Sequence, residues 1–349
     1  MSVSVVIPAY NAGAFIDESV QSVLVQDWPA DEIIVVNDGS TDRAYDELAA
    51  LGSNIRVVNQ RNRGVSAARN RGCELATSEY VAILDADDVW LPGKLRAQMM
   101  HLTLHPESDA VFCRGLYWHP DPGGDTWVRP DRPPGVSDAA SDVKRLHYAD
   151  FLYTLPVASS TMVVKKSVWQ AIGGFDETMS YAEDQHFNLR LSRNYHVDLL
   201  QMVGMLYRRH LHSATARVQD RNHWAEVTSG AVTAMGLTDA SGVRTDRGKV
   251  RRRVAQLHFY HGYDHFWRGR LPVARWEFWR AFRKNPRDRK TIAYLLISAI
   301  PGLPRAAKLL QPAVGRFLGG KIGATHRPAD DTSGILDNVE TPSRSVAPR

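Results

Sequence analysis

The sequence contains few cysteines and no apolar run long enough to cross a membrane. Only Cys73 and Cys113 occur among 349 residues, too few for a disulfide framework, and neither lies in a CxxC metal motif. No stretch reaches the ~18 apolar residues of a spanning helix. The N-terminal segment MSVSVVIPAYNAG lacks the basic residues of a signal peptide and is typical of a β-strand. We therefore expect a protein of the reducing cytoplasm.

Motifs of several large enzyme classes are also absent. The sequence has no GxGxxG and no GxxxxGKS/T, which disfavours dinucleotide-dependent oxidoreductases and P-loop enzymes. His101 and His105 have the spacing of a zinc-binding pair, but no HExxH motif or cysteine accompanies them. We therefore interpret both histidines as surface residues of an amphipathic helix. We also find no Ser-His or Cys-His arrangement for covalent catalysis.

Positive charge is concentrated in the last third of the chain. The net charge is +5, yet 19 Lys or Arg stand against 4 Asp or Glu between Arg244 and Lys321. Aromatic residues are interleaved with arginines from Trp267 to Arg283. We interpret this region first as a helical pair with an aromatic core and solvated arginines. An anionic membrane surface is the second partner we consider, and nucleic acid is the least favoured.

Strand and helix patterns alternate in the N-terminal half. This alternation predicts an α/β fold with a mostly parallel sheet flanked by helices, whose ligands bind beyond the carboxyl ends of the strands. We expect this domain to span 1–220, followed by a helical basic region over 221–324 and a disordered tail over 325–349. The predicted strands are 3–8, 32–38, 55–58 and 80–85, and the clearest predicted helices are 15–26, 64–76 and 91–102.

Three carboxylates follow the fourth predicted strand in the segment YVAILDADDVW. Asp85, Asp87 and Asp88 would repel one another at the end of an apolar strand unless a cation lies among them. Two carboxylates on a short loop suit Mg²⁺ or Mn²⁺, which keep positions for water and substrate phosphate. An Asp-rich helix cap would have the same composition, but the position after a buried strand favours the metal. His210, after a later strand, could complete such a site, although loop histidines are usually just exposed.

Further polar residues follow the first two strands and begin two helices. Tyr10 can stack on a ring, and Asp38 can accept hydrogen bonds from a base or a ribose, although ordinary βα turns have the same composition. Arg69 can reach a phosphate or belong to a solvated basic face. Glu183 and Asp184 begin a helix, where either a favourable helix dipole or a role as general base would account for them.

Six segments together resemble the family 2 inverting glycosyltransferases, which have the GT-A fold of nucleotide-diphospho-sugar transferases. Each segment alone is a weak signal, but all six occur in the family's order and cover roughly residues 3–215. The segments are VSVVIPAYNAGAFIDESVQSVLVQ, DEIIVVNDGSTD, NRGVSAARNRG, YVAILDADDVWLPGKLRAQ, STMVVKKSVWQAIGGFDE and AEDQHFNLRL.

The resemblance implies a nucleotide-sugar donor, a Mn²⁺ or Mg²⁺ cofactor and inverting transfer to a hydroxyl. Asp87 would bind the metal that bridges the diphosphate, and Asp184 would be the catalytic base. An aspartate with an ordinary pKa is a weak base, so we expect it to accept the proton late. The candidate substrate-binding residues are Pro8, Ala9, Tyr10, Asn11, Asp38, Arg69, Asp85, Ala86 and Glu183. The resemblance assigns Pro8, Ala9, Tyr10 and Asp38 to the base, Asp85 to the ribose, and Glu183 with the turn 173–177 to the acceptor.

We therefore predict a hexosyltransferase-type enzyme that acts on a glycan or lipid-linked acceptor in polysaccharide or glycoconjugate synthesis. A lipid-linked acceptor would place it in the cytoplasm, peripheral on the inner face of the membrane. The alternatives are a non-catalytic protein that binds sugar nucleotides or glycans and, less favoured, a sugar nucleotidyltransferase, since IPAYNAGAF has no Lys or Arg. Specificity is expected to depend largely on the loop 120–138.

Overall fold

One mixed β-sheet organises the chain. The computed structural model describes residues 1–43, 45–118, 142–154, 157–210, 218–300 and 335–336. Its strands are β1 (Val3–Ala9), β2 (Glu32–Asn37), β3 (Ile55–Asn59), β4 (Tyr80–Ile83), β5 (Val89–Trp90), β6 (Ala110–Trp118), β7 (Val143–Leu146), β8 (Val163–Lys165), β9 (Val197–Arg208) and β10 (Ile335–Leu336). Its α-helices are α1 (Ile16–Leu24), α2 (Val65–Leu75), α3 (Lys94–Leu104), α4 (Tyr148–Tyr153), α5 (Lys166–Ile172), α6 (Glu183–Asn194), α7 (His223–Met235), α8 (Arg247–Trp267), α9 (Leu271–Lys284) and α10 (Arg289–Ala299), with 3-10 turns at Asp46–Leu51 and Ser159–Thr161.

The sheet has a parallel half and a mixed half. The strand order is β3-β2-β1-β4-β8-β6-β9-β5, with β7 beside β9 and β10 beside β6. The first four strands of this order are parallel, as their alternation with helices predicts. β8 pairs antiparallel with both β4 and β6. β5 pairs antiparallel with the end of β9, which brings residues that follow β9 beside the loop after β4.

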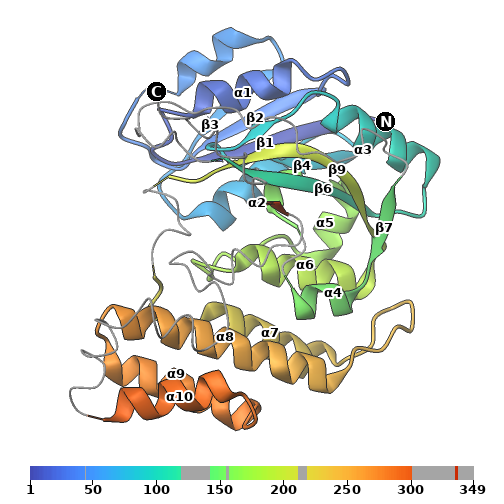
Figure 1. Cartoon of the computed structure of the whole chain (residues 1–349). Helices are drawn as coiled ribbons and strands as arrows, with labels where there is room; N and C mark the ends of the chain where they lie inside the picture. The colour runs from blue at the N-terminus through green and yellow to red at the C-terminus, as the bar shows by residue number, and fades with distance from the viewer. Residues whose placement is uncertain (44, 119–141, 155–156, 211–217, 301–334, 337–349) are drawn as a thin grey trace, which may run out of the picture.

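Helices cover both faces of the sheet (Figure 1). Val3, Val5 and Ile7 of β1 pack with α1 and α3, whereas Val6 packs with α2, α5 and α6, because successive strand residues point to opposite faces. All seven residues of β1 are buried, so this strand lies at the centre of the fold. The predicted α/β architecture with a mostly parallel sheet and flanking helices is confirmed.

The C-terminal helices form two groups. Val227 of α7 and Val250 of α8 share a core with Phe187 of α6, so this core continues beyond residue 220. Beyond it, the second half of α8 packs with α9 and α10 around an aromatic core that includes Phe266 and Tyr294. This arrangement confirms the predicted helical pair with an aromatic core. Among the described residues, we find no helix with the length and apolar character needed to span a bilayer.

Two expectations need comment. His101 is only 6% exposed and its Nε2 lies 3.0 Å from Asp198 Oδ2, so the prediction of a surface residue is wrong. His101 follows the buried Lys94 by seven residues and therefore belongs to the sheet-facing stripe of α3, whereas His105 at its end is exposed. The predicted specificity loop and the predicted tail lie outside the described residues, except for β10.

Candidate active site

The loops after β1 and β2 meet at the carboxyl end of the parallel strands. Ala9 ends β1, and its backbone oxygen accepts a hydrogen bond from Asp38 N at 2.8 Å. Asn11 has a left-handed φ of 49°, and its Oδ1 accepts from Thr41 N at 2.8 Å. Asn11 therefore joins the two loops. Tyr10 is 55% exposed at this edge, so its ring is available for stacking on a ligand.

Asp38 is bound by the protein's own donors. It is 2% exposed and accepts hydrogen bonds from Gln60 Nε2, Arg63 N and Gly64 N at 2.8, 2.9 and 2.8 Å. These three bonds fix the loop between β3 and α2 against the end of β2. Asp38 thus has a structural role at the edge of the site. A direct contact of Asp38 with a nucleotide base stays a prediction.

A buried arginine connects the carboxylate loop to the start of α6. Arg69 is 4% exposed, and its Nη2 donates to Asp85 Oδ1 at 2.7 Å while its Nη1 donates to Glu183 Oε1 at 2.8 Å. Phe175 lies under the guanidinium at 5.3 Å. The carboxylates raise the pKa of Arg69 although its burial opposes this. Arg69 and Glu183 are 114 positions apart in the sequence, and a contact of Arg69 with phosphate stays a prediction.

The start of α6 holds the candidate base. Ala182, before the helix, has a left-handed φ of 61°, which costs a non-glycine residue about 1–3 kcal/mol. Burial, followed by repulsion from Glu183, raises the pKa of Asp184 to about 7 against the opposing charge of Arg69. Asp184 Oδ1 accepts from Gln185 N at 2.7 Å. The expectation of a weak base with an ordinary pKa is therefore corrected, because this carboxylate is matched to neutral pH.

Asp88 fixes the carboxylate loop 85–88 to the buried residues of the sheet. It is 1% exposed, and its two oxygens accept from Ser160 Oγ at 2.6 Å and Arg208 N at 3.1 Å. Burial and the charges of Asp87 and Asp85 raise its pKa well above the ordinary range. Arg208 Nε also donates to Asp87 O at 2.8 Å. Asp88 therefore positions the loop from the core side and is not exposed to a ligand.

Asp87 and His210, the candidate metal ligands, lie within hydrogen-bond distance of each other. Asp87 Oδ2 lies 3.0 Å from His210 Nε2, and the ring of His210 lies 4.8 Å from that of Phe15. The described residues include no cluster of three or more His, Cys, Asp or Glu that could hold a metal. A carboxylate and an imidazole nevertheless fit an ion that takes its remaining ligands from substrate phosphate and water. The pairing of β5 with β9 is what places His210 here.

The remaining candidate residues lie within the scaffold. Pro8 is buried in β1 opposite Val36, and Ala86 is 5% exposed. Ser19 Oγ lies at 2.8 Å from Ala86 O and 2.7 Å from Asp88 O, so α1 supports the carboxylate loop. The backbone of Pro8 and Ala86 therefore supports the loops that carry the candidate ligands.

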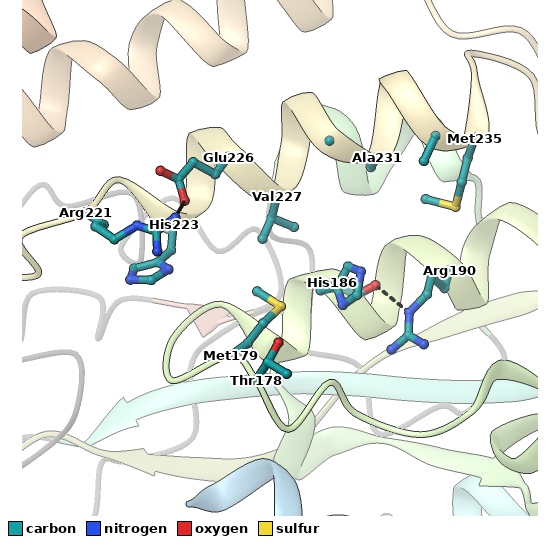
Figure 2. A pocket seen from close by; sticks show the side chains of 12 residues that line it. Thr178, Met179, His186, Arg190, Arg221, His223, Glu226, Val227, Ala231 and Met235 are labelled. Carbon is teal, nitrogen blue, oxygen red and sulfur yellow. Dashed lines mark hydrogen bonds and ion pairs between the residues drawn. The ribbon is translucent and has the colours of Figure 1, made fainter.

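A cavity of about 480 Å³ lies between α6 and α7 (Figure 2). The side chains of α6 and the preceding loop face those of α7 across it. His186 and Thr178 contribute polar groups, and Gly230 leaves open space where a side chain would stand. Asp184 is two residues from His186, although it does not line the cavity itself. The lining residues are Thr178, Met179, His186, Arg190, Arg221, His223, Glu226, Val227, Gly230, Ala231, Ala234 and Met235.

Comparison with known sequences matches residues 4–152 to the family described as Glycosyl transferase family 2. The chain is 40% identical over 127 residues to the uncharacterized glycosyltransferase YibD of Escherichia coli, covering 36% of each chain. It is 29% identical over 222 residues to the uncharacterized glycosyltransferase EpsJ of Bacillus subtilis, covering 61% of this chain and 62% of that one. The chain thus spans about a third to two thirds of the length of these relatives.

Comparison with solved structures shows the same fold at greater distance. S. aureus TarS 1–349, in complex with UDP-GlcNAc, superposes with a TM-score of 0.60 at 18% identity, over 91% of this chain and 90% of that one. The same region of TarS in complex with UDP gives a TM-score of 0.57. At this identity the likeness establishes the fold.

Proposed function

Because residues 4–152 match the family described as Glycosyl transferase family 2, we propose that the protein transfers a sugar from a nucleoside-diphosphate donor to a hydroxyl with inversion. The observation that carries this proposal is the double ion pair of Arg69 with Asp85 and Glu183. It joins the end of β4, where the donor would bind, to the residue beside Asp184. The UDP-GlcNAc complex of TarS supports a donor of this class.

Asp184 would act as the general base. Its carboxylate takes the proton of the acceptor hydroxyl while that oxygen forms a bond to the anomeric carbon. The bond from this carbon to the diphosphate oxygen breaks on the opposite face of the sugar, so the configuration inverts. A pKa of about 7 keeps a large fraction of Asp184 ionised at neutral pH and gives it more basicity than an ordinary carboxylate.

Asp87 and His210 would hold the divalent ion. A bound Mn²⁺ or Mg²⁺ stabilises the negative charge of a departing diphosphate. The imidazole of His210 favours Mn²⁺, since Mg²⁺ prefers oxygen ligands. Asp85 is not assigned to the metal, because its Oδ1 forms an ion pair with Arg69 Nη2 at 2.7 Å.

We place the acceptor, a glycan or a lipid-linked sugar, on the α6 side of the site. Thr178 and Met179 follow the turn 173–177 directly and line the cavity of Figure 2. The cavity lining combines apolar side chains, such as Val227 and Met235, with the charged side chains of Arg190, Arg221 and Glu226, of which the last two form an ion pair of 3.0 Å. A sugar acceptor with both hydroxyl and apolar faces suits such a lining.

Nucleotide release from a panel of UDP-, GDP-, CDP- and TDP-sugars with Mn²⁺ tests the proposal. We expect one donor class to release nucleotide with the unchanged protein and not with Asp184→Asn, although calorimetry shows that both bind it. Binding without release by the unchanged protein would instead favour a non-catalytic binding protein. Formation of a nucleotide sugar from a nucleoside triphosphate and a sugar phosphate would favour a nucleotidyltransferase.

A further inference from the structure

One face of α9 exposes tryptophans and arginines together. Trp276 and Trp279 are 56% and 38% exposed, although large apolar side chains are normally covered. Arg280 and Arg283 continue the same face, because residues at i, i+3, i+4 and i+7 lie on one side of a helix. The opposite side of α9 is buried in the aromatic core. We call Trp276, Trp279, Arg280 and Arg283 the Trp–Arg face.

Cations gather at the C-terminal end of this face. Arg251 of α8 donates from Nη2 to Arg283 O at 3.0 Å, which brings a cation of α8 to the end of α9. Partial burial, and then the charges of Arg280, Arg251 and Arg283, lower the pKa of Lys284. Four cations therefore act on one another at this end. Such crowding is relieved by a negatively charged partner.

The segment that carries the Trp–Arg face contains few acidic residues. Only Glu277 and Asp288 are acidic between Arg268 and Lys290, a stretch that holds 9 Lys or Arg. Glu277 is 4% exposed, its Oε2 lies 2.7 Å from His258 Nδ1, and its Oε1 accepts from Arg280 Nη1 at 3.3 Å. Asp288 Oδ2 accepts from Thr291 N at 3.2 Å as the cap of α10. Glu277 is thus shared between Arg280 and the histidines of α8, and the positive charge around the Trp–Arg face exceeds the negative charge beside it.

The geometry of the tryptophans suits a lipid surface better than a nucleic acid. Their rings stack on each other with centroids 4.9 Å apart and an interplanar angle of 20°. The guanidinium of Arg283 lies 4.9 Å from the ring centroid of Trp279. The two rings thus cover one face of each other, and Arg283 lies over Trp279, which leaves fewer ring faces on which unpaired bases could stack. The exposed ring edges and arginines match the headgroup layer of a bilayer, where Trp and Arg are favoured.

We propose that the Trp–Arg face docks the protein on an anionic phospholipid surface. Its occupant is the headgroup layer, with phosphates against Arg280 and Arg283 and the tryptophan edges at the boundary of the acyl chains. The protein would then be peripheral, on the cytoplasmic leaflet. Docking goes beyond the proposed sugar transfer and does not depend on it. A lipid-linked acceptor would nevertheless be brought to the surface on which the enzyme lies.

Vesicle co-sedimentation with the full chain tests this proposal. We compare phosphatidylcholine vesicles with vesicles that contain 30 mol% phosphatidylglycerol, at low and high salt. The protein should bind the anionic vesicles and be released by salt. Arg280→Gln with Arg283→Gln should lower binding about 30-fold, from roughly fivefold for each charge near an anionic surface. Trp276→Ala with Trp279→Ala should lower it as well, and should remove quenching by brominated acyl chains.

Matched control variants remove the same kinds of side chain, charged or apolar, at exposed positions outside the Trp–Arg face. Arg56→Gln with Arg96→Gln removes two exposed charges from the N-terminal domain, and Met100→Ala with Leu104→Ala removes two exposed apolar side chains. Both should bind as the unchanged protein does, and so should Asp184→Asn, which separates docking from catalysis. Equal binding to neutral and anionic vesicles, or equal effects of the controls, would overturn the proposal. So would tighter binding of a DNA duplex that depends on the same four side chains.

Discussion

Replacing Asp184 by asparagine should stabilise the protein at high pH while it removes activity. Ionising Asp184 costs free energy in the folded state, since its pKa lies at about 7 and not at 3.8. That difference corresponds to about 4 kcal/mol at most, because each pKa unit is worth 1.36 kcal/mol. Asp184 is partly exposed, so water screens part of this cost and we expect about 1–2 kcal/mol to be realised. Asparagine has the same shape and carries no charge.

The pH dependence has a definite sign. A raised folded-state pKa gives stability that is complete below pH 3.8 and is lost as pH rises through about 7. Urea unfolding should therefore give similar stabilities for the two proteins near pH 4 and a more stable Asp184→Asn at pH 8.5. Asp27→Asn, an exposed change on the same domain, should show no such divergence. If the stabilities of Asp184→Asn and the unchanged protein change with pH in parallel, the raised pKa of Asp184 is refuted.

Three further predictions concern the neighbours of this carboxylate. Arg69→Met should cost about 3–5 kcal/mol in urea unfolding, because two partly buried carboxylates lose the buried guanidinium that they share; a cost below about 1 kcal/mol would mean that water solvates them instead. His210→Gln should raise the Mn²⁺ concentration for half-maximal activity at least about tenfold, and an unchanged metal titration would remove His210 from the site. Gly230→Leu should raise the acceptor KM without changing donor binding, whereas Gly230→Ala should only add about 0.5–1 kcal/mol of helix stability; equal acceptor kinetics would place the acceptor elsewhere.

Local patterns predicted the parallel half of the fold. Apolar β-branched runs marked β1, β2 and β4 because each is short and buried on both faces, whereas β3 is a partly exposed edge strand, and the helices α1 and α2 have their own periodicity. The carboxylates at the end of β4 and the start of α6 were also visible, since they follow from element boundaries. Between β2 and β3, where Ser40 and Thr41 are residues typical of a helix start, the described residues form only the 3-10 turn Asp46–Leu51. Turn residues there indicated where a helix could begin but not how long it would last.

The features of the site that the sequence did not reveal depend on contacts between residues far apart in the chain. Arg69 looked like a ligand for phosphate because nothing nearby in the sequence shows that Glu183, 114 positions later, would occupy it. The pKa of Asp184 follows from burial and from this charge cluster, neither of which has a sequence signal. His210 was visible only as a loop histidine. Its position beside Asp87, 123 residues away, is set by the pairing of β5 with β9.

The stereochemistry of the product tests the central claim most directly. After the donor panel identifies a substrate, the anomeric configuration of the newly formed glycosidic bond can be read by proton NMR during the first turnovers. A single base on α6 opposite a departing diphosphate predicts inversion relative to the donor, with a rate that rises with pH through about 7. A product that retains the donor configuration, or a rate independent of pH in this range, would contradict the role of Asp184.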